Sequence, residues 1–152
     1  MSDIDLDLLT YGSQGFNCSQ IIILLGLRLQ DRENPELVRA MEGLGNGLGF
    51  CGETCGALLG GCSLIAMNAG KGAPDERAHD RLPVMIAALV EWFRETACAE
   101  CSGIRCADIL DDAEAGPDMQ RCGQLVSGVY GKALAILEEN DIDPTVPIEE
   151  RM

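Results

Sequence analysis

The chain has 152 residues, with 25 Asp and Glu against 11 Lys and Arg, a formal net charge of −14 and eight cysteines. This length fits one domain with its own core, so we expect a single domain over residues 1–152. Because no cluster of Lys and Arg is present, we expect no nucleic-acid partner. No apolar run reaches eighteen residues, so we expect no membrane insertion.

The acidic N-terminus lacks the basic start and the apolar core of a secretory signal, so we expect a cytoplasmic protein. Thiols stay mostly reduced in that compartment. Eight cysteines are therefore better explained as metal ligands or redox groups than as a permanent disulfide framework.

The first third of the chain predicts three helices. Residues 3–11 form a short helix whose acidic first turn suits the helix dipole. Asn17 is a good N-cap for a helix over residues 18–30, in which Cys18 lies in the first turn on the apolar face. Pro35, a residue favoured at the first helical position, begins the third helix.

Alternate glycines over residues 43–49 predict neither a helix nor a strand. The pattern matches a dinucleotide-binding loop only loosely, and no strand precedes it, so we reject a phosphate site. The backbone amides of such a loop can instead hydrogen-bond to thiolates or sulfides. We expect close backbone approach to a bound group at Gly47, Gly49, Gly52 and Gly56.

The apolar segment that follows predicts a central helix over residues 51–67. Cys51, Cys55 and Cys62 would then lie at about 0°, 40° and 20° around the helix axis, on one narrow stripe. Glycines at 52, 56, 60 and 61 leave little side-chain bulk. That face would pack either on a second copy of the chain, giving a homodimer, or on another helix of the same chain.

A long helix is expected over residues 75–98, with Pro83 kinking it or starting it anew. Cys98 and Cys101 then form a C-x-x-C pair, which indicates a redox pair or metal ligands. Ser102, not His, follows this pair, so we expect no haem.

The remainder predicts one turn over residues 107–111, a helix over residues 118–139 with Cys122 one turn in on its apolar face, and an extended tail from Asn140 to Met152. No segment alternates like a strand. We therefore expect an all-α bundle of about five helices, in which a glycine-rich loop leads into a central cysteine-bearing helix. Thiolates converging in such a bundle hold either zinc or an iron–sulfur cluster.

The spacing of Cys18, then Cys55-Gly56-Ala57-Leu58-Leu59-Gly60, then Cys106 and Cys122 resembles the C_GCAxxG_C_C family of redox-active proteins. That family is similar to part of the split-Soret cytochromes c, which carry an iron–sulfur centre besides haem. The resemblance implies Cys18, Cys55, Cys106 and Cys122 as cluster ligands. Four further cysteines lie outside this set and could act as alternative ligands, a second centre or a redox pair: Cys51, Cys62, Cys98 and Cys101.

Three functions follow from these features. The first is an electron-transfer or redox-sensing protein that binds an iron–sulfur cluster and has no substrate chemistry of its own. The second is a metal-free thiol–disulfide redox protein, which is the form an enzymatic role would take. The third is a structural zinc site, although the usual paired C-x-x-C zinc spacing is missing. The redox partner protein is unknown.

Overall fold

The computed structural model describes residues 3–97, 101, 103–109 and 119–151, and its regular elements are helices. Five helices have eleven residues or more: α1 (Asp3–Ser13), α2 (Cys18–Leu29), α5 (Gly56–Ala69), α6 (Leu82–Trp92) and α8 (Met119–Glu139). Shorter elements connect them: α3 (Pro35–Met41), a 3₁₀ turn (Glu42–Leu44), α4 (Asn46–Phe50), a π-helical turn (Phe93–Ala97), α7 (Cys106–Ile109) and α9 (Ile148–Arg151). The predicted all-α class, with about five substantial helices, is confirmed.

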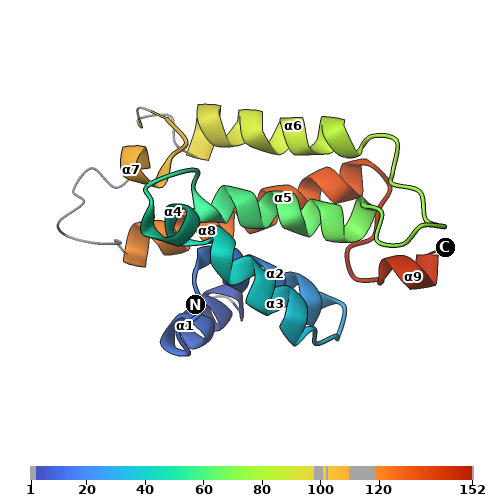
Figure 1. The fold of residues 1–152 in the computed structure, drawn as a ribbon, viewed down its shortest axis with the longest axis horizontal. Helices are drawn as coiled ribbons and strands as arrows, with labels where there is room; N and C mark the ends of the chain where they lie inside the picture. The colour runs from blue at the N-terminus through green and yellow to red at the C-terminus, as the bar shows by residue number, and fades with distance from the viewer. Residues whose placement is uncertain (1–2, 98–100, 102, 110–118, 152) are drawn as a thin grey trace.

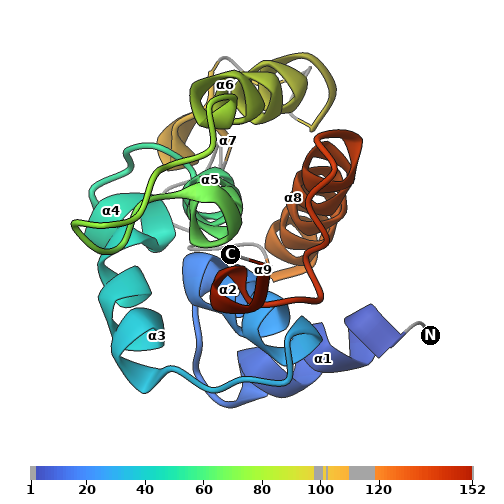
Figure 2. The same cartoon turned by 90° about the vertical axis from the view of Figure 1, so that its right-hand side faces the viewer.

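Helix α5 lies at the centre of the bundle. Seen end-on in Figure 2, it is surrounded by α2, α4, α6 and α8. Its Leu64 and Ile65 side chains are fully buried, and the facing helices supply much of the remaining core. The core side chains of α8 are those that the 3.6-residue period predicted: Leu125, Val126, Val129, Ala133, Ile136 and Leu137.

The small-residue face of α5 packs within the chain. A Cβ added at Gly60 would lie 3.1 Å from the Cα of Ser19 in α2, and one added at Gly61 would collide with Val129 of α8. Of the two arrangements considered for this face, the structure has the one in which helices of the same chain cover it. The face is therefore not available to a second copy.

The predicted helix over residues 51–67 begins too early. Helix α5 starts at Gly56, with Cys55 as its N-cap, and the single stripe of Cys51, Cys55 and Cys62 is therefore wrong. The cause is the backbone before it, because Phe50 has φ of 68° and Gly52 has φ of 72°, values that no right-handed helix contains.

Two other predicted boundaries also differ. The helix expected over residues 75–98 begins only at Leu82, with proline in its first turn, because Pro83 has no N–H to continue an earlier helix. The tail expected to be extended includes the short helix α9, whose Arg151 guanidinium donates to the Asn68 side chain at 3.0 Å. Of the helices within the described residues, none combines the length and apolar character needed to span a membrane.

Candidate functional site: a cluster of three thiols

The site begins with a turn of left-handed backbone at α4. All five of its residues have positive φ, between 55° and 68°, and the Gly49 N–H donates to the Gly45 carbonyl at 2.9 Å. Glycine adopts this conformation freely, but each L-residue in a left-handed helix costs about 1–2 kcal/mol. Leu48 and Phe50 are therefore strained positions, whereas asparagine tolerates the region well.

The chain after this turn pairs with a segment fifty residues away. Thr54 and Arg105 form an antiparallel bridge, the Cys55 N–H donates to the Ile104 carbonyl at 2.9 Å, and the Cys106 N–H donates to the Glu53 carbonyl at 2.6 Å. These bonds hold the backbones of Cys55 and Cys106 side by side. Figure 1 shows the result, with α4, α7 and the start of α5 gathered at one end of the molecule.

Cys18 reaches the same place from α2. Asn17 caps that helix, its side chain accepting from the Gln20 N–H while the Gln20 side chain accepts from the Asn17 N–H. This box fixes the first turn, in which Cys18 is the first residue. A Cβ added at Gly56 would lie 2.5 Å from the Cys18 sulfur, so this thiol rests directly on the backbone where α5 begins.

Cys18, Cys55 and Cys106, the thiol cluster, are near enough to affect one another electrostatically. Burial raises the pKa of Cys55 to about 11, the Leu58 and Ala57 amides at the start of α5 act in the opposite direction, and the Cys18 and Cys106 thiols add to the rise. Burial also raises the pKa of Cys106, with a contribution from Cys18. Without a compensating positive charge, Cys55 and Cys106 therefore favour the protonated thiol.

Three of the four predicted glycines are required by this packing. A Cβ at Gly47 would lie 2.7 Å from the Cys106 Cβ, one at Gly56 would meet the Cys18 sulfur, and one at Gly52 would lie 3.2 Å from the Ala107 Cβ. Nothing lies within 4 Å of a Cβ at Gly49, although its φ of 68° favours glycine. The expectation was a close backbone approach to a bound group, and in the structure Gly47 and Gly56 closely approach Cys106 and Cys18.

Cys122, the fourth ligand implied by the sequence, is half-buried in the first turn of α8. In Figure 1 that end of α8 lies at the same end of the molecule as α4 and α7. Cys62 is half-buried inside α5, two turns beyond Cys55, and burial raises its pKa. Cys51 is exposed.

The C-x-x-C pair is described at one of its two positions. Cys101 is disulfide-bonded, and the Arg121 guanidinium lies 3.1 Å from its sulfur. Cys98 lies outside the described residues. The pairing of a cation with Cys101 was not predicted, because Arg121 is twenty residues away in α8.

Within the described parts of the chain, no three His, Cys, Asp or Glu side chains are grouped compactly enough to hold a single metal ion. The donors available to a larger group are the cluster thiols. The left-handed turn and the pairing of residues 52–55 with 104–107 were both missed by sequence reasoning. The available signal was the alternation in Asn46-Gly47-Leu48-Gly49-Phe50, which shows where glycine is spaced but not which conformation results.

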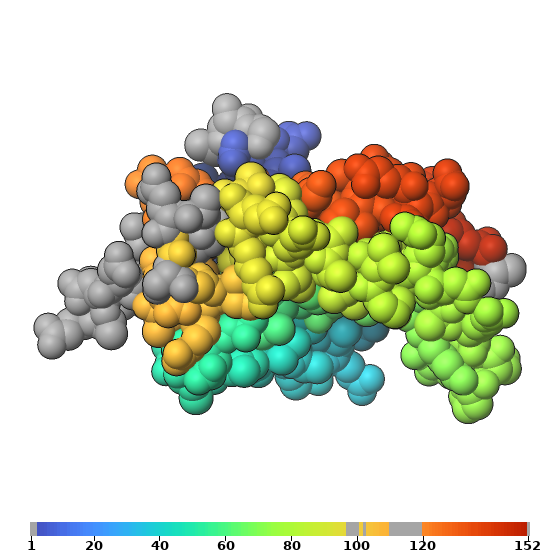
Figure 3. Space-filling model, turned by 90° about the horizontal axis from the view of Figure 1, so that it is seen from above, coloured from blue at the N-terminus to red at the C-terminus, as the bar shows by residue number. Residues whose placement is uncertain are grey.

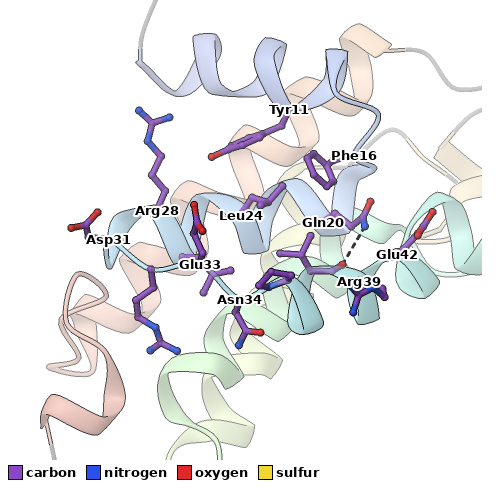
Figure 4. Close-up of a pocket in the computed structure, with 14 residues that line it drawn as sticks. Tyr11, Phe16, Gln20, Leu24, Arg28, Asp31, Glu33, Asn34, Arg39 and Glu42 are labelled. Carbon is purple, nitrogen blue, oxygen red and sulfur yellow. Dashed lines mark hydrogen bonds between the residues drawn. The ribbon is translucent and has the colours of Figure 1, made fainter.

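A separate groove of about 760 Å³ runs between α1, α2 and α3. Tyr11, Phe16 and Leu24 line its apolar part, and charged residues including Arg28 and Arg39 lie along it (Figure 4). The described residues that line this groove include no cysteine, so it is distinct from the thiol cluster.

Comparison with known proteins gives one match. The model of the family described as "Putative redox-active protein (C_GCAxxG_C_C)" matches residues 16–136, which include all three cluster cysteines and Cys122. No curated protein and no solved structure matches the chain.

Proposed function

The chain belongs to the C_GCAxxG_C_C family of redox-active proteins, and from that premise we propose that it is an electron-transfer protein that holds an iron–sulfur cluster through cysteine thiolates. The observation that carries the proposal is the cluster of Cys18, Cys55 and Cys106 around the start of α5. Paired backbone holds Cys55 beside Cys106, and the Cys18 sulfur rests on the Gly56 backbone. Cysteine thiolates are the usual ligands of such clusters.

The chemistry of the donors fits this cofactor. Burial disfavours a bare thiolate at Cys55, and bound iron would supply the missing positive charge, because a coordinating thiol is deprotonated outright. The Leu58 and Ala57 amides favour negative charge on the Cys55 sulfur. Amide hydrogen bonds to sulfur and burial are two means by which a protein sets a cluster's reduction potential.

Cys122 is the proposed fourth ligand. It lies half-buried in the first turn of α8, a helix packed on both α2 and α5. Thiolates around a cluster stand further apart than those around one zinc ion, because irons and sulfides occupy the space between them. A cluster is therefore compatible with three thiols that do not form a compact single-ion site.

Serine substitutions test the proposal. We expect Cys18→Ser, Cys55→Ser and Cys106→Ser to lower the iron and acid-labile sulfide of anaerobically prepared protein severalfold, and Cys122→Ser to do the same. Cys51→Ser, at an exposed thiol, and Cys62→Ser, at a half-buried one, are the matched controls and should keep both. Equal loss in controls and ligand variants would contradict this ligand set.

The disulfide at Cys101 favours a second candidate, a metal-free thiol–disulfide redox protein. Two electrons and two protons from a dithiol reductant would open the disulfide to two thiols, and the reductant would itself become a disulfide. The Arg121 guanidinium, 3.1 Å from the sulfur, would favour a thiolate at Cys101 after reduction. This candidate requires a protein without iron whose free-thiol count rises by two on reduction.

A further inference from the structure

Two apolar side chains stand in solvent beside the thiol cluster. Phe50 is 76% exposed and Leu48 is 38% exposed. Both belong to α4, in which the buried Gly47 packs so closely on Cys106 that an added Cβ would lie only 2.7 Å from the Cys106 Cβ. The turn thus touches the cluster through Gly47, while Leu48 and Phe50 face outward.

The stability of the fold does not explain why Leu48 and Phe50 occupy these two positions. Both have positive φ, where glycine would relieve strain. Phe50 gains little stability from burial, because 76% of it is exposed, and Leu48 is only partly covered. Strained residues often occur at functional sites, so a role of these two side chains outside the folded core would explain them. In Figure 3 the blue-green segment that includes α4 borders the orange residues 103–109 on one face of the molecule.

We propose that Leu48 and Phe50 form the contact through which a basic redox protein docks on the thiol cluster. The proposal rests on the proposed electron-transfer function. The protein carries a net charge of −14, so a partner of opposite charge is attracted and an acidic one is repelled. Glu42 is exposed before the turn, and Glu53, exposed after it, pairs with Arg105 at 3.6 Å.

The docked partner exchanges one electron with this protein. One protein is oxidised and the other reduced, no covalent bond forms or breaks, and no proton is transferred. The path for the electron from the docked partner through α4 to Cys106 is short, because the Gly47 backbone of the same turn packs on Cys106. An exposed aromatic side chain at the centre of a small interface is the kind of residue that carries much of the binding energy.

The test uses the full-length protein, a small basic cytochrome c as the probe, and the double variant Leu48→Ala/Phe50→Ala. Its matched control is Leu6→Ala/Leu9→Ala, which removes two leucines that are 52% and 60% exposed on α1. Binding is measured by titration at low and high ionic strength, and the rate of cytochrome reduction by stopped flow. Iron content and the visible spectrum are recorded for each protein.

We expect the α4 variant to bind the probe about tenfold more weakly than wild type, with a matching loss of rate, while its iron content and spectrum stay unchanged. The α1 variant should behave as wild type, and salt should weaken binding in all three. Equal affinity in the α4 variant and wild type, equal loss in the α1 variant, or no salt-sensitive binding by wild type would overturn the proposal.

Two further results separate the possible failures. A wild-type protein without iron and sulfide would remove the electron-transfer function and, with it, the docking proposal. A wild-type dimer that Leu48→Ala/Phe50→Ala converts to a monomer would assign the contact to a second copy of the chain, and would overturn the proposal while leaving the cluster intact.

Discussion

At the scale of single residues, the Cys55 thiol is governed by opposing effects. Burial removes solvent from the charged form and raises its pKa to about 11, while the Leu58 and Ala57 amides favour that charge. Burial prevails, so in the reduced, metal-free protein the thiolate is scarce at neutral pH. The same residue becomes a strong ligand only when a cation accompanies deprotonation.

This balance predicts slow alkylation of Cys55. At pH 8 roughly one Cys55 in a thousand is a thiolate, so its reaction with iodoacetamide in metal-free protein should be far slower than that of the exposed Cys51. The rate should rise about tenfold per pH unit until the pH nears the pKa. Peptide mapping by mass spectrometry measures both sites. Cys55 labelling as fast as Cys51 at pH 8 would contradict the pKa.

Gly56 gives a second prediction at this scale. Its substitution by alanine places a Cβ 2.5 Å from the Cys18 sulfur and 2.9 Å from the Gly45 Cα, and backbone cannot move aside cheaply. Gly56→Ala should therefore lower the free energy of unfolding by about 1–3 kcal/mol. Urea unfolding measures the change, and iron content should fall with it.

Gly131→Ala is the control for that variant. Gly131 lies within α8, and nothing stands within 4 Å of an added Cβ. Alanine there should raise the free energy of unfolding by about 0.5–1 kcal/mol, as expected for a helix interior. If both alanine variants stabilised the protein, Gly56 would not be a point of close packing.

At the scale of elements, the left-handed turn of α4 is the least regular part of the site. Phe50 has φ of 68° and is 76% exposed, so burial of its side chain offsets little of the strain in its backbone. Phe50→Gly should raise the free energy of unfolding by about 0.5–1 kcal/mol. The relief of about 1–2 kcal/mol of backbone strain exceeds the stability lost to the greater entropy of the unfolded chain.

Phe50→Ala separates strain from lost contacts. Alanine keeps the unfavourable φ, so this variant should not gain stability in the same urea titration. A Phe50→Gly variant less stable than Phe50→Ala would contradict the strain assigned to the positive φ at this position.

The elements differed in how far sequence could predict them. The helix that begins at Cys18 was predicted from the Asn17 cap and its apolar period, and the core face of α8 from period alone, because both signals are local. The conformation of α4 is not fixed by such a signal. Alternate glycines permit many backbones, and the left-handed one is selected by packing against Cys106.

At the scale of the whole molecule, segments distant in sequence complete both the site and the core. The pairing of Thr54 with Arg105 joins Cys55 to Cys106. Neither segment has a local sequence pattern that predicts the pairing. Convergence of the thiols could therefore be expected from the sequence, but not its position in the fold. The family resemblance implied four cysteine ligands, and the structure brings three of those four cysteines together.

Asn68 joins the C-terminal end to the core. It is 1% exposed, its amide oxygen accepts from Gln30 and Arg151 at 3.0 Å each, and its amide nitrogen donates to the Leu64 carbonyl. Asn68→Ala should lower the free energy of unfolding by about 1–3 kcal/mol, because buried donors lose their acceptor. Hydrogen exchange should also quicken in α9.

Glu149→Gln is the control, since it removes the charge that pairs with Arg32 at 3.2 Å and acts on Arg151, while the hydrogen bonds of Asn68 stay in place. Its effect on unfolding should not exceed about 1 kcal/mol. An Asn68→Ala variant as stable as Glu149→Gln would mean that the buried network contributes little.

The most direct test of the central claim is the iron and acid-labile sulfide content of protein purified without oxygen, together with its visible spectrum. We expect equal amounts of iron and sulfide, in a fixed molar ratio to the protein, and a brown absorption that bleaches when the protein is reduced. A colourless protein without iron or sulfide, whose only redox change is a disulfide that opens on reduction, would contradict it.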